Sequence, residues 1–141
     1  MNRTASAIWT GGLKGGKGLL STQSGVLNQT PYGFATRFES GPGTNPEELI
    51  AAAHAGCFTM ALAAQLEKDG RTAERLETSA AVTLAKVDGD YSITAVHLDL
   101  VARIPGTDPA TFARIAQVAK EACPVSKLLA AEITLSARLE R

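Results

Sequence analysis

The longest apolar pattern in the chain runs from Leu49 to Ala64, directly after the segment Thr44-Asn45-Pro46-Glu47-Glu48. Asparagine is a good helix cap, proline suits the first helical position, and acidic side chains favour the positive end of a helix. The pattern therefore predicts a helix from Pro46 to about Asp69, with Gly70 as its stop. Because this helix is apolar on every face, we expect it to be buried on all sides.

Alternating apolar and polar positions predict strands in the rest of the chain. They cover residues 4–10, 19–23, 33–39, 75–87, 91–104 and 133–139. Asp88-Gly89 is typical of a tight hairpin between the two long strands. A second helix is predicted from Asp108-Pro109 to about Ala122. Proline disfavours helical geometry in the residue before it, so Cys123-Pro124 ends this helix, and a short turn over 125–130 leads to the last strand.

The order βββ-α-ββ-α-β predicts a single α+β domain over residues 1–141, with antiparallel sheets. A long apolar helix is hard to cover with one small chain. The small residues along it, Ala51 to Ala53 and Gly56 among them, allow close approach of a second helix. We therefore expect a homodimer in which sheets of both subunits cover two central helices.

The composition, 45% hydrophobic and 20% charged with zero net charge, is that of an ordinary globular protein. Neutral net charge gives no reason to expect nucleic acid or an anionic membrane as a partner. No uninterrupted apolar run reaches the roughly 18 residues of a membrane span. Polar and glycine-rich sequence follows the N-terminus where a signal peptide would be apolar. We expect a cytoplasmic protein.

The two cysteines, Cys57 and Cys123, are the main candidates for chemistry. In a reducing compartment, a pair of thiols forms transient catalytic or redox-sensing disulfides rather than structural ones. Two cysteines with the scattered His54 and His97 do not make a metal site, and the glycine-rich turn at 11–18 lacks a phosphate-binding motif. We expect neither metal nor cofactor. The alternative is that both cysteines are small buried hydrophobic residues.

Cys57 lies in the middle of the predicted helix, where the helix dipole does little for a thiolate. An ordinary thiol is only about 3% ionised at pH 7, so a reactive Cys57 needs a cation. Arg37 is the best candidate, with Glu47 to orient it. Each also has a structural interpretation, Arg37 as a surface partner of Glu39 and Glu47 as a helix-start acid.

Spacing limits this assignment. Ten residues of helix separate Glu47 from Cys57, which is roughly 15 Å along the axis. Antiparallel helices of a dimer would instead place Glu47 of one chain beside Cys57 of the other, which predicts composite sites.

Cys123 is a competing nucleophile, because backbone N–H groups of the turn that follows lower a thiol pKa. His54, one turn before Cys57, is either a base for a cysteine–histidine hydrolase or a core histidine.

Three segments carry a resemblance to a known family. They are Ser24 to Gln29 with Pro31 to Phe34, Gly43 to Ile50 continuing to Ala53-His54-Ala55-Gly56-Cys57-Phe58, and Cys123-Pro124-Val125-Ser126. With Arg37 and Glu47 in place, the chain resembles the OsmC branch of the OsmC/organic hydroperoxide resistance family over nearly its full length.

The resemblance implies a peroxidase, an antioxidant enzyme that reduces organic hydroperoxides and, less well, hydrogen peroxide. It implies that Cys57 attacks the peroxide, that Cys123 resolves the resulting sulfenic acid, and that Arg37 and Glu47 hold the thiolate. It also implies an intertwined homodimer, long central helices wrapped by antiparallel β-sheets, recycled by a dithiol such as a lipoylated protein. A non-catalytic redox sensor or small-ligand-binding dimer on the same fold is the alternative.

Overall fold

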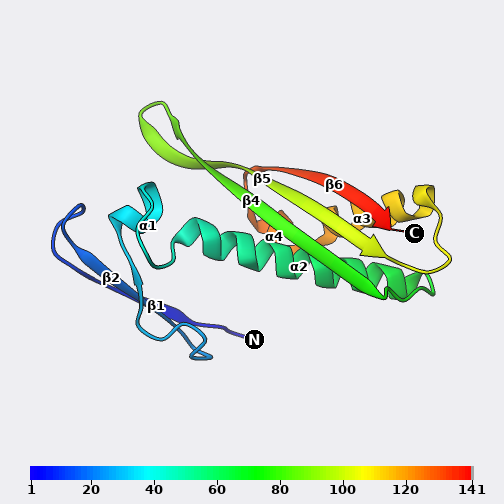
Figure 1. The fold of residues 1–141 in the computed structure, drawn as a ribbon, viewed down its shortest axis with the longest axis horizontal. Helices are drawn as coiled ribbons and strands as arrows, with labels where there is room; N and C mark the ends of the chain where they lie inside the picture. Colours follow the sequence, from blue (N-terminus) through cyan, green and yellow to red (C-terminus); the bar gives the residue numbers. More distant parts are fainter. Residues whose placement is uncertain (141) are drawn as a thin grey trace. The chain divides into compact units, whose positions relative to one another are not determined.

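The computed structural model describes residues 1–140, which divide into two compact units. The first unit is Met1–Leu49 and the second begins at Ile50, within the long helix. The elements, labelled in Figure 1, are β1 (Ala5–Thr10), β2 (Lys17–Thr22), β3 (Thr30–Tyr32), α1 (Phe34–Phe38), α2 (Pro46–Lys68), β4 (Arg75–Val87), β5 (Asp90–Arg103), α3 (Pro109–Ala122), α4 (Pro124–Leu128) and β6 (Glu132–Glu140). The α+β class is confirmed, whereas the expectation of one domain over 1–141 stays a prediction.

The first unit is built on a three-stranded sheet in the order β1-β2-β3, with both pairings antiparallel. The glycine-rich segment forms the turn between Thr10 and Lys17, which face each other across the β1–β2 pair. Gly11 has φ +93°, a left-handed backbone that glycine adopts without a steric cost. The strand β1 lies at the edge of its sheet, and every one of its residues is exposed.

The strand predicted over 33–39 is wrong, because residues 34–38 form the short helix α1. Thr36 explains the difference. Its hydroxyl accepts a hydrogen bond from the Gly33 N–H at 2.8 Å and donates to the Gly33 carbonyl at 2.9 Å, which closes the first helical turn. Phe34 and Phe38 stack with ring centroids 5.0 Å apart, the four-residue spacing of a helix face. Arg37 therefore lies on a helix and not on a strand.

The long helix α2 begins and ends as predicted, within one residue. The Asn45 side chain accepts the Glu48 N–H at 2.7 Å and caps the helix. Gly70, with φ +70°, follows the last turn. By length and mean hydropathy (1.5), this helix could cross a membrane, contrary to the expectation from apolar runs. That is weak evidence, because the core helix of a globular protein passes the same test.

In the described chain α2 is not buried on all sides, so that expectation is not met by one chain. One face is buried, and the opposite face is exposed and consists of Ala52, Ala53, Gly56, Met60, Ala63 and Ala64. Met60 is 76% exposed. The other residues of the exposed face are small, and all of them are apolar, so this face presents no polar side chain to water.

The second unit contains the sheet β4-β5-β6. The hairpin of β4 and β5 is confirmed, with Asp88 (φ +51°) and Gly89 (φ +88°) in its turn. The pairing of β5 with β6 is parallel, which corrects the expectation of purely antiparallel sheets. The chain crosses through α3 and α4 between these strands, and a helical crossover returns it in the same direction.

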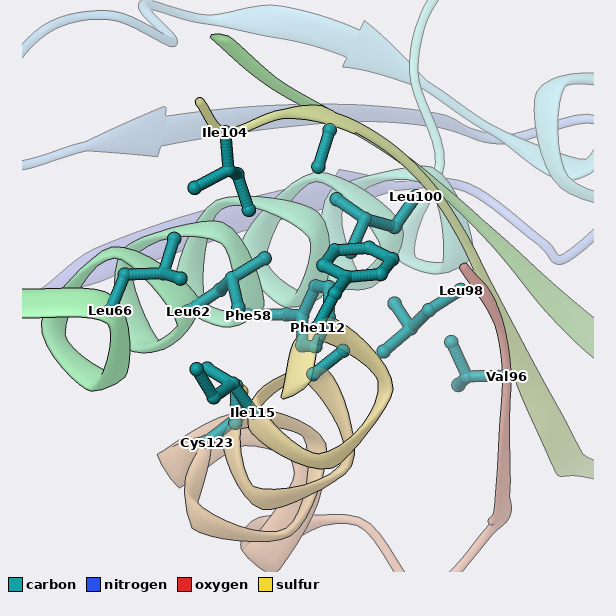
Figure 2. Packing of buried hydrophobic residues seen from close by; sticks show 13 residues of the cluster. Phe58, Leu62, Leu66, Val96, Leu98, Leu100, Ile104, Phe112, Ile115 and Cys123 are labelled. Carbon is teal, nitrogen blue, oxygen red and sulfur yellow. The ribbon is translucent and has the colours of Figure 1, made fainter. Parts of the chain in front are cut away.

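The core of the second unit lies where α2, β5 and α3 meet (Figure 2). Phe58, Leu62 and Leu66 repeat every fourth residue along α2 and are at most 1% exposed. They pack with Leu98 and Leu100 of β5 and with further residues of α3. Each such side chain contributes roughly 1.5–3 kcal/mol when fully buried. This packing fixes the α2 turns that carry His54 and Cys57.

Candidate active site

The two cysteines lie in contact in the second unit. Cys123 Sγ is 3.1 Å from Cys57 Sγ, and both are free thiols. A disulfide needs about 2.05 Å between sulfurs, so a two-electron oxidation and an approach of roughly 1 Å more would join them. Cys57 is half-buried and Cys123 has no exposed surface. The pair is therefore arranged for reversible disulfide formation, with Cys57 as the more accessible sulfur.

Local sequence places Cys123 at the junction of two helices. It ends α3, and its own N–H donates to the Ala119 carbonyl. Pro124 then occupies the first position of α4, where a missing N–H costs nothing. The break predicted at Cys123-Pro124 is confirmed, although the turn expected at 125–130 largely forms the short helix α4. The proline thus directs the sulfur toward α2.

The two thiols ionise with unequal ease. Burial raises the pKa of Cys57, a hydrogen bond from the Val125 N–H opposes this in part, and the neighbouring Cys123 raises it further. Burial also disfavours charge on Cys123, but the Ser126 N–H, the Cys57 thiol and the Ser126 hydroxyl outweigh it, so the pKa of Cys123 is lowered. The neutral Cys123 thiol donates to Cys57, and these roles reverse once Cys123 has lost its proton.

Within the second unit, the thiolate is therefore better supported at Cys123. In the second unit taken alone, both sulfurs remain candidates for the attacking residue. The two criteria point to different residues, because the more accessible sulfur is the less acidic one. A positive charge added beside Cys57 would draw the proton toward Cys123.

Arg37 and Glu47 form a second pair, within the first unit. Arg37 Nε donates to Glu47 Oε1 at 2.9 Å, and Nη2 lies 2.9 Å from the same oxygen in an ion-pair contact. The guanidinium also lies 5.3 Å from the centre of the Phe38 ring, within range of a cation–π contact. Glu47 is 8% exposed, and its Oε2 has no hydrogen-bond partner within residues 1–140. Arg37 thus contacts Glu47, as the sequence predicts. The guanidinium forms its ion pair with Glu47 instead of with Glu39.

Aromatic residues surround Arg37 in the first unit. A cavity of about 310 Å³ is lined by Trp9, Leu13, Tyr32, Gly33, Phe34, Arg37 and Phe38. Trp9 and the aromatic residues at 32, 34 and 38 therefore form a pocket wall. Phe58 is 0% exposed and belongs to the core of the second unit.

His54 is fully buried, and its Nε2 lies 2.8 Å from Ser126 Oγ. Burial lowers its pKa, so the ring is neutral. Its hydrogen bond goes to Ser126 and not to Cys57, which removes the geometry of a cysteine–histidine hydrolase. Sequence reasoning gave Ser126 no role. The signal was its spacing, because a residue three positions after Cys123 in a helical turn faces back toward that cysteine.

The described part of the chain contains no group of three or more His, Cys, Asp or Glu side chains that could hold a metal ion. His97 makes a surface hydrogen bond to Thr134 of β6. The second unit supplies two adjacent thiols, and the first unit supplies a guanidinium held by a carboxylate.

Comparison with known proteins places the chain in a family. Residues 39–138 match the family of OsmC-like proteins. The chain is 52% identical to the Peroxiredoxin OsmC of Escherichia coli, over 99% of its own length and 98% of that protein. It is 29% identical to the Organic hydroperoxide resistance protein of Xanthomonas axonopodis over 100 residues, 70% of this chain and 68% of that one.

A solved structure supports the same assignment. The organic hydroperoxide resistance protein OhrB of Bacillus subtilis superimposes with a TM-score of 0.69 at 26% identity, covering 97% of this chain and 98% of that one. Sequence and fold thus agree over almost all of the chain. This protein belongs to the OsmC-like family.

Proposed function

We propose that this protein is a thiol peroxidase that reduces organic hydroperoxides to alcohols, with hydrogen peroxide a poorer substrate. The observation that carries the proposal is the 3.1 Å contact between an accessible thiol and a buried one. The full-length similarity to Peroxiredoxin OsmC supports it. So does the presence of relatives that bear the name organic hydroperoxide resistance protein.

Cys57 is the attacking residue in this proposal, because peroxide reaches a half-buried sulfur more readily than a fully buried one. Its thiolate attacks the peroxide oxygen that carries the hydrogen, an S–O bond forms and the O–O bond breaks. The alkoxide leaves and takes up a proton to become the alcohol, and Cys57 becomes a sulfenic acid. The aromatic cavity beside Arg37 suits the alkyl group of an organic peroxide, since its other lining residues are mostly aromatic.

Cys123 resolves the sulfenic acid. Its thiolate attacks Cys57 sulfur, the S–S bond forms, and hydroxide leaves as water after taking up a proton. The lowered pKa of Cys123 favours this step, because the attacking sulfur must be ionised. An external dithiol, such as the lipoyl group of a lipoylated protein, then reduces the disulfide. The contact between the sulfurs supports an intrachain bond.

Arg37 and Glu47 supply the positive charge that Cys57 needs. A guanidinium beside Cys57 would stabilise its thiolate and shift the proton of the pair toward Cys123. Ten residues of α2 separate Glu47 from Cys57, too far for both to reach one small site in the same chain. In the proposed dimer, the Arg37–Glu47 pair beside Cys57 therefore belongs to the partner protomer. The unpartnered Glu47 Oε2 supports this arrangement, since a buried carboxylate oxygen normally has a donor.

The protein acts as a homodimer in this proposal, located in the cytoplasm, where thiols are kept reduced. The exposed apolar face of α2 supports a second copy, because such a face is stable when another apolar surface covers it. A Cβ added at Gly56 would meet nothing within 4 Å, so the face has room for a close neighbour. The exposed edge strand β1 offers a second surface for the partner.

Steady-state turnover tests the proposal. The wild-type protein is supplied with dihydrolipoamide and either tert-butyl hydroperoxide or hydrogen peroxide, and peroxide consumption is followed. We expect continuous turnover, faster with the organic peroxide, and none in Cys57→Ser. A single oxidation event without cycling would instead identify a redox sensor and refute the peroxidase proposal.

A further inference from the structure

His54 is a buried titratable residue that the proposed peroxidase mechanism does not use. Its side chain has no exposed surface, and its Nε2 contacts Ser126 Oγ at 2.8 Å across the gap between α2 and α4. The Ser126 hydroxyl and backbone N–H act on the Cys123 sulfur and help to lower its pKa. His54, Ser126, Cys123 and Cys57 thus follow one another from a buried ring to the reacting sulfurs, with 2.8 Å between His54 Nε2 and Ser126 Oγ and 3.1 Å between the two sulfurs.

The number of protons that His54, Ser126 and Cys123 can donate fixes the direction of each hydrogen bond between them. A serine hydroxyl has one proton to donate. A thiolate only accepts, so an ionised Cys123 takes that proton in a hydrogen bond from Ser126. Ser126 must then accept from His54, which requires the proton of the neutral ring to be on Nε2. Nδ1 is left as a bare acceptor, and it has no partner among the residues that the structure describes.

We propose that His54 is a positioning residue whose Nε2–H holds the Ser126 hydroxyl so that this hydroxyl donates to the Cys123 sulfur. Without the histidine, the hydroxyl would be free to turn and donate elsewhere. The burial of His54 favours this function, because the neutral ring has a single N–H, which the contact with Ser126 holds on Nε2, and it adds no charge beside the thiols. The inference deepens the proposed function, on which it rests for its role in turnover.

The arrangement acts on two steps, both through Cys123. When the Cys123 thiolate attacks the sulfenic sulfur of Cys57, the fixed hydroxyl increases the share of Cys123 that is ionised. When an external dithiol attacks Cys57 in the disulfide, the S–S bond breaks and its electron pair passes to Cys123 sulfur. The same hydroxyl then stabilises the leaving thiolate, and a more stable thiolate leaves faster.

The test measures the Cys123 thiolate directly, in the full-length protein without peroxide. Cys57→Ser leaves a single thiol and keeps a hydroxyl donor beside it, and ultraviolet absorbance of the thiolate against pH gives the pKa of Cys123. Adding His54→Leu or Ser126→Ala should raise this pKa by about one unit, the effect of losing one hydrogen bond to a charged group. Adding His54→Gln should restore it, because the glutamine amide presents an N–H near the position of Nε2.

Three outcomes would overturn the inference. An unchanged pKa in His54→Leu means that the histidine does not act on Cys123. A raised pKa that His54→Gln fails to restore, in protein folded by circular dichroism, means that packing and not the N–H is responsible. A shift in Ser126→Ala alone means that Ser126 acts without His54. Because the titration needs no turnover, it succeeds or fails independently of the peroxidase assay on the wild type.

Discussion

Replacing Glu47 by glutamine tests the charged pair while keeping its shape. Arg37 reaches one oxygen of Glu47 with two nitrogens, each at 2.9 Å. A glutamine amide oxygen in the place of Oε1 would still accept from Arg37 Nε, while the amide NH2 takes the place of Oε2, so the variant removes the negative charge and keeps the contact with Arg37. If Glu47 orients Arg37 toward the Cys57 thiolate, the variant should weaken that support without abolishing it.

The magnitude follows from the two contacts. Arg37 keeps its charge, so the variant loses the attraction between two full charges and not the hydrogen bond itself. An ion pair near the surface contributes up to about 1 kcal/mol. The Arg37 side chain is 39% exposed, so water screens part of this difference. We expect a total of about 1 kcal/mol, which corresponds to a roughly fivefold slower oxidation of Cys57.

Stopped-flow oxidation of the reduced protein by tert-butyl hydroperoxide, measured against pH, gives the rate. Glu47→Gln should be slower at neutral pH and approach the wild type at high pH, where Cys57 ionises without help. Glu48→Gln is the matched control, since it removes the same charge from the same helical turn, and Glu48 bonds to Thr44 and to the Asn45 cap instead of to Arg37. An equal loss in both variants, or a pH profile unchanged in Glu47→Gln, would refute the reasoning.

Three further predictions concern other parts of the molecule. Cys123→Ser should leave a sulfenic acid on Cys57 that dimedone labels after one equivalent of peroxide, and labelling of Cys57→Ser with none of Cys123→Ser would reverse the two roles. Met60→Lys places a charge on the exposed α2 face and should shift the protein from dimer to monomer in analytical ultracentrifugation; an unchanged mass would exclude this face as the interface. Because burial lowers the pKa of His54, the unfolded chain binds a proton more readily, so the free energy of unfolding should fall as pH drops below about 6.5. His54→Gln should lose this pH dependence, and urea denaturation at several pH values measures it.

Much of the secondary structure could be predicted because its signals are local. Asn45 and Pro46 begin α2, the Asp88-Gly89 turn joins β4 to β5, and Pro124 ends α3, each through backbone geometry within a few residues. The prediction of a strand around Arg37 was wrong, again because of a local signal. The alternating pattern was only a few residues long, and the Thr36 hydroxyl closed a helical turn instead.

The candidate site could be predicted in its residues but not in its connections. The sequence by itself determined that two thiols, one arginine and one helix-start acid were the groups available, since side-chain chemistry is independent of the fold. Only the tertiary structure decided that Cys57 meets Cys123 and that His54 meets Ser126, residues more than sixty positions apart. The parallel pairing of β6 was likewise decided there. Such contacts depend on how α2, α3 and β5 pack around a shared core, and packing over long sequence distances leaves no local pattern to follow.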